Sequence, residues 1–300
     1  MGSGSLDPAE TLAAVLPDWF RRTARDLPWR RPGTTAWGVL LSEVMLQQTP
    51  VVRVAPIWTE WVRRWPLPSA MAATPVAEVL RAWGSLGYPR RALRLHACAS
   101  VLAAAHGDVV PGDVDLLLTL PGVGSYTARA VACFSHGRRV PVVDTNVRRV
   151  VARAVHGRAE PGAPSVARDL ADTEALLPAD AAEAVVLSAA LMELGAVVCT
   201  ARNPRCEQCP VSSACAWVGG GRPAQVGTRT TVQRFAGTDR QVRGQLMAVL
   251  RGADGPVERE RLDVVWPQDP EQRVRALNSL VADGLVEPSG ADRFALAGEA

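Results

Sequence analysis

The chain has no lysine: all 33 of its basic residues are arginine. Abundant alanine, glycine and proline indicate a coding bias as the cause. The chemical consequence is the same whatever the cause. A lysine amine is the group that forms a Schiff base with a carbonyl carbon. Every mechanism that needs a lysine Schiff base is therefore excluded.

Long apolar runs are also missing, because no stretch reaches the roughly 18 apolar residues that a membrane-spanning helix needs. The first residues, MGSGSLDPAE, lack the basic start and apolar core of a signal peptide. We therefore expect a cytoplasmic protein, in which cysteine thiols stay reduced. Its 300 residues, 48% of them hydrophobic, are enough for one large domain or two modest ones.

Strand signals are scarce and helical periodicity is common, so the pattern predicts an all-α unit that runs to about residue 216. Proline and glycine mark most of the junctions between periodic segments. Tryptophans 58, 61, 65 and 83 are expected in the core. The predicted helices cover 36–48, 76–83, 90–105, 114–120, 125–134, 145–156, 167–177 and 181–195.

A second, smaller module follows a glycine-rich segment at 217–235, which is typical of a linker. Helical patterns cover 239–251, 257–266 and 270–283, and short apolar segments at 285–288 and 293–296 flank a turn at 289–292. Three helices followed by a hairpin predict a winged-helix-like module at 236–300. A helical appendage without specific function is the alternative.

Basic charge is concentrated between residues 121 and 158, where seven arginines accompany a single acid, Asp144. Such an excess favours binding to a phosphate backbone. A solvated surface face is the alternative. The net charge of the whole chain is only +3, so the local excess is more informative than the total.

Four of the six cysteines lie within one seventeen-residue stretch, CTARNPRCEQCPVSSAC, at positions 199, 206, 209 and 215. A tight cluster in a reducing compartment indicates metal binding. Zinc sites more often pair two short Cys-x-x-Cys motifs, and only Cys206 and Cys209 have that spacing here. Four thiolates in one loop fit an iron–sulfur cluster better than zinc or disulfides. Cys98 and Cys133 lie in helical patterns and are expected in the core.

A glycine turn, Leu-Pro-Gly-Val-Gly at 120–124, separates two predicted helices. Gly122 and Gly124 permit left-handed backbone and close approach to a ligand, and the helix beginning at Ser125 offers free N–H groups to a phosphate. Asp144 lies twenty residues beyond Gly124. It is a favoured N-cap for the helix beginning at Thr145, and this structural role does not exclude a chemical one.

Together these segments resemble the helix–hairpin–helix DNA glycosylases that carry a [4Fe–4S] loop, and in particular the MutY-type adenine glycosylases. The stretch SEVMLQQT at 42–49, the glycine turn followed by Tyr-Thr-Ala, the segment Ala-Leu-Met-Glu-Leu-Gly-Ala at 190–196 and the cysteine loop carry the resemblance. It implies a glycosylase domain at 6–216, with a six-helix-barrel lobe at 35–140 and an iron–sulfur lobe formed by 6–34 and 141–216.

The resemblance implies hydrolysis of adenine from A:8-oxoguanine or A:G mispairs in double-stranded DNA, by a monomer associated with the nucleoid. Glu43, in a mostly apolar helix where burial raises a carboxyl pKa, protonates the leaving base. Asp144 stabilises the cationic sugar, with Asn146 also catalytic. Tyr126 takes the place of the lysine of bifunctional relatives. The alternatives are a thymine or uracil mismatch glycosylase and a non-enzymatic iron–sulfur regulator that binds DNA.

The resemblance also implies the remaining site residues. The backbone at the glycine turn binds DNA phosphate, through Gly122, Gly124 and Ser125. The cysteines at 199, 206, 209 and 215 hold the cluster, which orders a loop whose basic residues meet the DNA backbone. The residues expected to contact substrate are Arg30, Leu46, Gln48, Thr49, Tyr88 and Glu193.

Two departures from the family are visible. The Asp-Gly-Asn common in the family reads Asp144-Thr145-Asn146 here. Residues 236–300 are too few for the Nudix-like domain with which MutY-type enzymes recognise 8-oxoguanine, partly through a Phe-Ser-His loop. The one Phe-Ser-His here, at 134–136, lies on the catalytic side of the chain and is treated as a coincidence. The resemblance therefore assigns no role to the last module.

Overall fold

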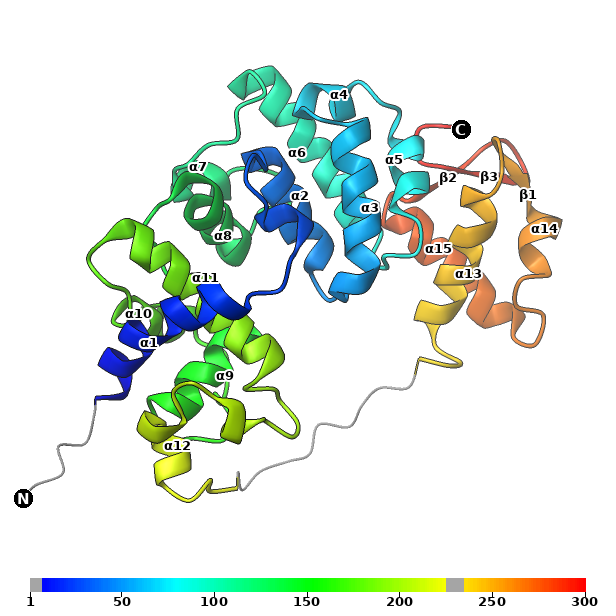
Figure 1. Ribbon diagram of the computed structural model, residues 1–300. Coiled ribbons are helices and arrows are strands. Elements are labelled where there is room, and N and C mark those ends of the chain that lie inside the picture. Colours follow the sequence, from blue (N-terminus) through cyan, green and yellow to red (C-terminus); the bar gives the residue numbers. More distant parts are fainter. Residues whose placement is uncertain (1–6, 225–234) are drawn as a thin grey trace, which may run out of the picture. The chain divides into compact units, whose positions relative to one another are not determined.

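The computed structural model describes residues 7–224 and 235–300 (Figure 1). The described chain forms two compact units. The first combines the N-terminal segment up to residue 36 with 111–118 and the chain from 123 onward, as far as the undescribed segment 225–234. The second combines 37–110, 119–122 and the C-terminal residues. Among the described residues, every helix is too short or too polar to span a lipid bilayer.

The first unit is helical, and its core lies between the N-terminal helix α1 and helices α9 and α11. Leu12 and Leu16 of α1 pack there with Val147 and Val150 of α9. Aspartates cap three of these helices, α1, α9 and α11. The Asp180 carboxylate, for example, accepts from the Glu183 N–H at 2.9 Å at the start of α11. The elements are α1 (Pro8–Thr23), η1 (Pro28–Arg30), α7 (Val114–Leu118), α8 (Ser125–His136), α9 (Thr145–Ala154), α10 (Val166–Glu174), α11 (Ala181–Val197), η2 (Cys206–Gln208), η3 (Ser212–Ala214) and α12 (Ala216–Gly219).

The second unit is built around buried tryptophans. The Trp61 ring meets Trp65 edge-on at 4.8 Å between centroids and Trp83 at 5.6 Å. Trp58 is also buried and donates to the Gly38 carbonyl at 2.7 Å. The predicted core positions of these four tryptophans are confirmed. The helices before the C-terminal module are α2 (Ala36–Leu46), α3 (Val51–Arg64), α4 (Pro68–Ala72), α5 (Val76–Trp83) and α6 (Arg90–His106).

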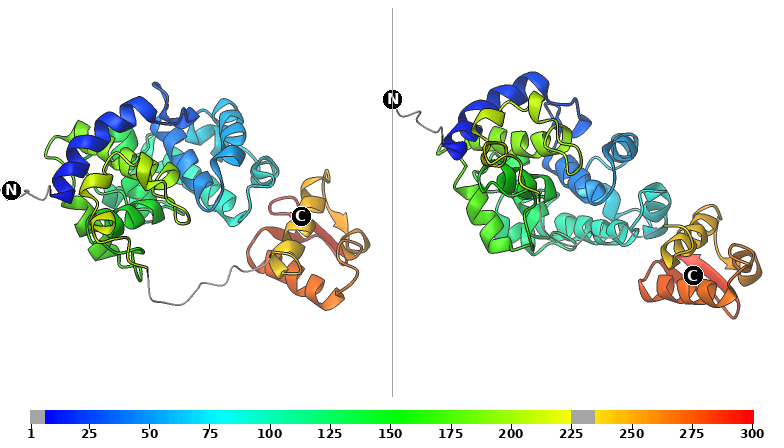
Figure 2. Two further views of the ribbon diagram at one scale, coloured as in Figure 1. Left: turned by 60° about the horizontal axis from the view of Figure 1, so that its bottom comes forward. Right: turned by 90° about the horizontal axis from the view of Figure 1, so that it is seen from below.

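The C-terminal module has three helices and a small antiparallel sheet, with strand order β1-β3-β2. In both views of Figure 2 its orange and red segments lie against one another. It is tied to α5 because the Arg81 guanidinium pairs with the Glu299 carboxylate at 2.8 Å and donates to the Ala253 carbonyl at 2.7 Å. The elements are α13 (Asp239–Arg251), β1 (Val257–Glu258), α14 (Arg259–Asp263), α15 (Pro270–Ala282), β2 (Val286–Pro288) and β3 (Arg293–Leu296).

Several predicted boundaries need correction. The segment 257–266 is not one helix, because Val257 pairs with Phe294 in the sheet and the helix begins only at Arg259. The predicted linker overlaps α12, and part of it, 225–234, lies outside the described residues. The pattern did not indicate α1, α3 or α4. Helices α7 and α8, assigned by sequence to the 35–140 lobe, group with the first unit.

Candidate functional site

Asp144 is the N-cap of α9. Its carboxylate accepts from the Val147 N–H at 2.7 Å and from the Asn146 side-chain amide at 2.8 Å. Burial raises the pKa of this carboxyl above its ordinary value of 3.8, and these hydrogen bonds and the charge of Arg149 oppose the rise without cancelling it. The role of Asp144 as an N-cap is therefore compatible with a chemical role. The two hydrogen bonds fix the carboxylate, and its other acceptor sites remain to interact with a cation.

A buried arginine links this carboxylate to the cysteine loop. Arg149 is 8% exposed. Its guanidinium donates to the Asn146 side-chain oxygen at 2.7 Å, to the Cys199 carbonyl at 2.7 Å and to the Gly195 carbonyl at 2.8 Å. Gly195 leaves no room for a side chain, since a Cβ there would lie 2.6 Å from the Asn146 Cβ. Asn146 is thus held from both sides.

The four cysteines of the loop are partly buried, and none forms a disulfide. Cys199, Cys209 and Cys215 pack against the core of the first unit. Burial raises the pKa of the Cys209 thiol to about 11, and the other three cysteines lie near enough to add to that rise. Among the described residues, no three potential ligand side chains converge on a single metal ion. A cubane cluster binds each thiolate through a different iron atom, so its ligands need not converge on one point.

A second buried arginine supplies positive charge beside these thiols. Arg153, 3% exposed, donates to the Cys199 sulfur at 3.5 Å and to the Thr200 carbonyl at 2.7 Å, and its guanidinium lies 4.8 Å from the Trp217 ring centroid. A cation and an N–H donor beside a thiolate favour an anionic cluster. The loop therefore fits an iron–sulfur group in its donor set and its charge.

The predicted phosphate-binding patch at 121–158 needs correction. Arg149 and Arg153 face inward, to the cysteine loop. Arg139 pairs with Glu174, and Arg148 pairs with Asp169 at 2.7 Å. The acids that neutralise this patch come from α10, which lies outside residues 121–158. The surface charge available to DNA here is therefore smaller than the sequence indicates.

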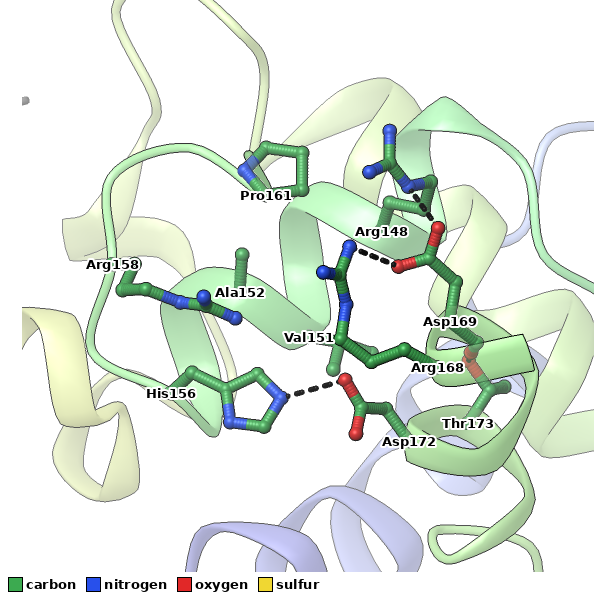
Figure 3. A pocket seen from close by; sticks show the side chains of 10 residues that line it. All are labelled: Arg148, Val151, Ala152, His156, Arg158, Pro161, Arg168, Asp169, Asp172 and Thr173. Carbon is green, nitrogen blue, oxygen red and sulfur yellow. Dashed lines mark hydrogen bonds and ion pairs between the residues drawn. The ribbon is translucent and has the colours of Figure 1, made fainter. Parts of the chain in front are cut away.

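A small pocket over α9 and α10 is lined by residues that form ion pairs with one another (Figure 3). Its cavity is about 10 Å³, with Arg148 paired to Asp169 and His156 paired to Asp172 at 3.0 Å. That space holds about one water molecule and no nucleobase.

Glu193, in α11, is fully buried, and its carboxylate binds two arginines. Arg25 binds the carboxylate through two hydrogen bonds of 2.6 and 2.9 Å, and Arg30 adds one of 2.9 Å. Burial acts to raise the Glu193 pKa, but the two arginines hold it below its ordinary value. The structure thus brings together two predicted substrate residues, Arg30 and Glu193. Their contact with adenine stays a prediction, and Arg25 is an addition that the sequence did not reveal.

The glycine turn has one left-handed residue. Gly122 has φ +78°, whereas Gly124 has φ −98° and is the N-cap of α8. A side chain at 122 would also meet the Arg94 Cβ at 2.7 Å. The expectation of left-handed backbone is thus met at Gly122 alone. Ser125 is partly exposed at the start of α8, where its hydroxyl accepts from Arg129 at 2.8 Å. Tyr126 packs on a small core with Val142.

Glu43 lies on α2, whose residues 37–45 are all buried, and it is itself 6% exposed. Beyond the end of this helix, Gln48 has left-handed backbone with φ +56°. Leu46 is partly exposed and Thr49 is buried. The Thr49 hydroxyl donates to the Leu86 carbonyl at 3.0 Å, so this side chain holds the next turn, and its substrate contact stays a prediction.

Arg91 organises both turns, and no sequence pattern indicates this role. It is 8% exposed and makes six hydrogen bonds, five of them to backbone carbonyls. Three accept at the end of α2, at Val44, Met45 and Gln47, and the Gly87 carbonyl accepts at 2.9 Å. Burial without an acidic partner lowers its pKa to about 10. Every residue type has a backbone carbonyl, so the sequence does not indicate which carbonyls Arg91 binds.

Comparison with known proteins identifies the family. A family model described as HhH-GPD superfamily base excision DNA repair protein matches residues 41–173, and one for the iron–sulfur binding domain of endonuclease III matches 199–215. An adenine DNA glycosylase of Mycolicibacterium smegmatis is 62% identical over 98% of this chain and 97% of its own length. The chain belongs to the adenine DNA glycosylases. The human adenine DNA glycosylase is 39% identical over 70% of this chain but only 40% of its own length.

Solved structures support the fold of this adenine DNA glycosylase family member. A thermostable thymine-DNA glycosylase matches with a TM-score of 0.64 and 26% identity, over 71% of this chain and 97% of that one. A trapped endonuclease III–DNA complex matches with a TM-score of 0.60 and 22% identity, over 72% and 99%. The chain is a helix–hairpin–helix DNA repair glycosylase with a [4Fe–4S] cluster as cofactor. Cys199, Cys206, Cys209 and Cys215 are the residues that would hold it.

Proposed function

We propose that this chain is a monofunctional glycosylase that hydrolyses the N-glycosidic bond of adenine mispaired with 8-oxoguanine or guanine in double-stranded DNA. The observation that supports this proposal most strongly is that the carboxyl groups of Glu43 and Asp144 lie in different surroundings. Glu43 is nearly enclosed in an apolar helix, and Asp144 is fixed by hydrogen bonds that favour its anion. Two acids with different environments are what glycosidic cleavage uses.

Asp144 is proposed to face the deoxyribose. Cleavage builds positive charge on the sugar, and a carboxylate about 4 Å away at an effective dielectric near 20 contributes about 4 kcal/mol. This corresponds to roughly a thousandfold in rate. Asn146 is proposed to support this stabilisation, because its side-chain amide donates to the Asp144 carboxylate and keeps it oriented.

Glu43 is proposed to protonate the adenine as it leaves, since an adenine anion is a poor leaving group. The Glu43 side chain is 6% exposed on a helix whose residues 37–45 are all buried. After the transfer, the Glu43 carboxylate directs the attacking water. The nucleotide is proposed to be extruded from the duplex before cleavage.

The absence of lysine supports hydrolysis without a lyase step. Tyr126 stands where bifunctional relatives have a lysine, and the chain has no other lysine to form a Schiff base. The Tyr126 phenol is proposed to hydrogen-bond near the sugar or Asp144.

The remaining assignments complete the proposal. Backbone at the glycine turn, with Ser125, binds DNA phosphate. The protein acts as a monomer in the cytoplasm, on nucleoid DNA. Substrate contacts are proposed for Arg30, Leu46, Gln48, Thr49, Tyr88 and Glu193, with Glu193 acting through the arginines that enclose it.

A panel of duplexes tests the proposal. Each carries adenine, thymine or uracil opposite each partner base, and the free base is measured after incubation with the cluster-loaded protein. We expect adenine alone, released most rapidly opposite 8-oxoguanine or guanine. The fold likeness to a thymine-DNA glycosylase makes pyrimidine release the competing result, and its appearance without adenine would reject the proposal.

A further inference from the structure

The last turn of α9 touches two of the four cysteines of the loop. The Arg153 guanidinium donates to the Cys199 sulfur at 3.5 Å, and the Arg153 backbone carbonyl lies 3.6 Å from the Cys215 sulfur. Cys199 opens the loop and Cys215 closes it. One residue of α9 therefore contacts both ends of the segment that would hold the cluster. The proposed function gives this residue no role.

Backbone carbonyls fix the orientation of the Arg153 guanidinium. It donates to the carbonyls of Ala159 at 2.9 Å, Thr200 at 2.7 Å and Ala201 at 3.3 Å. The last two carbonyls belong to the cysteine loop itself. The same Nη1 atom binds the Thr200 carbonyl and the Cys199 sulfur, and its two N–H groups are enough for both. The N–H that points at sulfur is therefore held in place by three other hydrogen bonds.

A tryptophan lies against this guanidinium. The Trp217 ring centroid is 4.8 Å from the Arg153 guanidinium carbon, which is within the range of a cation–π contact. Trp217 follows Cys215 by two residues and belongs to α12, which packs on α9 (Figure 1). Its indole N–H donates to the Pro223 carbonyl at 3.0 Å, so the ring is held as well. A partly buried ring in contact with an almost fully buried charge is placed to separate that charge from water.

The charge of Arg153 acts on the sulfur with little compensation. The Arg153 side chain is only 4% exposed, whereas the Glu160 side chain, whose carboxylate lies 3.6 Å away, is 43% exposed. Solvent therefore screens the opposing charge of Glu160. Arg149 has a different task, because it binds the Cys199 carbonyl and not the sulfur. N–H donors to sulfur, local charge and solvent access are the factors that set the reduction potential of an iron–sulfur centre.

We propose that Arg153 and Trp217 form a clamp that retains the cluster and sets its reduction potential. Arg153 is a positioning residue: its N–H holds the Cys199 sulfur, and its charge stabilises the reduced, more negative state of the cluster. Trp217 holds the guanidinium and keeps water away from that sulfur. The clamp concerns the cofactor and goes beyond the proposed function, so it holds whichever base the enzyme excises.

Five variants of the full chain, each loaded with its cluster, test the clamp. Arg153→Gln removes the charge, Arg153→Lys keeps the charge without the planar group, and Trp217→Leu removes the ring. Arg148→Gln is the matched control for arginine, because Arg148 is also on α9 but pairs with Asp169 of α10. Trp266→Leu is the control for tryptophan, because Trp266 is also partly buried but belongs to the C-terminal module.

Three properties are measured: the reduction potential of the cluster in a redox titration, the rate at which visible absorbance is lost in air with a chelator, and the unfolding temperature. We expect Arg153→Gln and Trp217→Leu to lose absorbance about tenfold faster than either control. The reduction potential should fall in Arg153→Gln, because the reduced state loses a positive charge and an N–H donor. Arg153→Lys and Trp217→Leu keep the charge, so their potentials should stay nearer to that of wild type.

Cluster loss from Arg153→Gln and Trp217→Leu at the rates of the two controls would overturn the proposal. A lower unfolding temperature of Arg153→Gln with an unchanged potential would also overturn it, since that result shows a structural role alone. Arg153→Lys and Trp217→Leu decide if Arg153→Gln does not fold, and control-like rates in both would reject the clamp. Adenine release by wild type is a separate measurement, and its failure would reject the proposed function without affecting the clamp.

Discussion

The substitution Gly195→Ala should break the hydrogen bond with which Asn146 orients the Asp144 carboxylate. A Cβ at 195 would lie 2.6 Å from the Asn146 Cβ and 3.0 Å from the Asn146 carbonyl oxygen. Carbon atoms in contact are about 3.5–4.0 Å apart, so the start of α9 must move by about 1 Å. The Asn146–Asp144 hydrogen bond is 2.8 Å long and would stretch beyond the limit of a hydrogen bond.

The stability effect has two opposed parts. Alanine in a helix is favoured over glycine by about 0.5–1 kcal/mol. Overpacking against backbone costs about 1–3 kcal/mol, so Gly195→Ala should be net destabilising. Gly244→Ala is the control, because it makes the same change inside α13 with no atom within 4 Å of the new Cβ. It should stabilise the protein by about 0.5–1 kcal/mol.

Single-turnover release of adenine from an A:G duplex measures the effect on the site. A misplacement of about 1 Å costs roughly a hundredfold in rate, which is the loss expected for Gly195→Ala with the cluster still bound. Thermal unfolding of both alanine variants measures the stability part. Excision of adenine by Gly195→Ala at the wild-type rate, together with an unfolding temperature as high as that of Gly244→Ala, would show that Gly195 does not position Asn146.

Three further predictions concern Arg149, Arg91 and Asp144. Arg149→Lys should lower adenine release at least tenfold, because lysine cannot reach Asn146, Gly195 and Cys199 from one planar group. Visible absorbance should show that the cluster is retained. Unchanged release would argue against a link from the cysteine loop through Arg149 to Asp144. Arg91→Lys should lower the free energy of unfolding by about 3 kcal/mol in denaturant titrations, because lysine has at most three donors for the six hydrogen bonds of Arg91. A loss below about 0.5 kcal/mol would contradict this prediction. The raised Asp144 pKa should place the acid limb of the excision rate above pH 3.8. Because a raised pKa gives stability that is lost as pH rises through it, Asp144→Asn should be more stable than wild type at neutral pH and equal to it in acid; thermal unfolding across pH checks the sign.

The parts of the site that could be predicted from sequence depend on local chain geometry. Asp144 is where an N-cap is expected, and the cysteine loop is contiguous in sequence. Helix periodicity likewise placed most helices, since it depends on neighbours three and four positions apart. The segment at 257–266 failed because strand pairing with Phe294, far along the chain, decides its conformation.

The arginines show why the rest could not be predicted. Arg91, Arg149 and Arg153 bond mainly to backbone carbonyls of other elements, and every residue type carries a carbonyl. A count of charge between 121 and 158 also overlooks Asp169 and Glu174, which approach only when α10 packs on the first unit. Local basic excess therefore overstated the surface charge available to DNA.

The most direct test of the account compares wild type, Asp144→Asn and Glu43→Gln for single-turnover release of free adenine from duplexes containing A:8-oxoguanine. We expect rapid release by wild type, and a loss of about a thousandfold for Asp144→Asn with DNA affinity retained. Glu43→Gln should be similarly impaired, since glutamine cannot supply the proton. Adenine release by Asp144→Asn or Glu43→Gln at the wild-type rate would contradict the assignment of these two carboxyl groups.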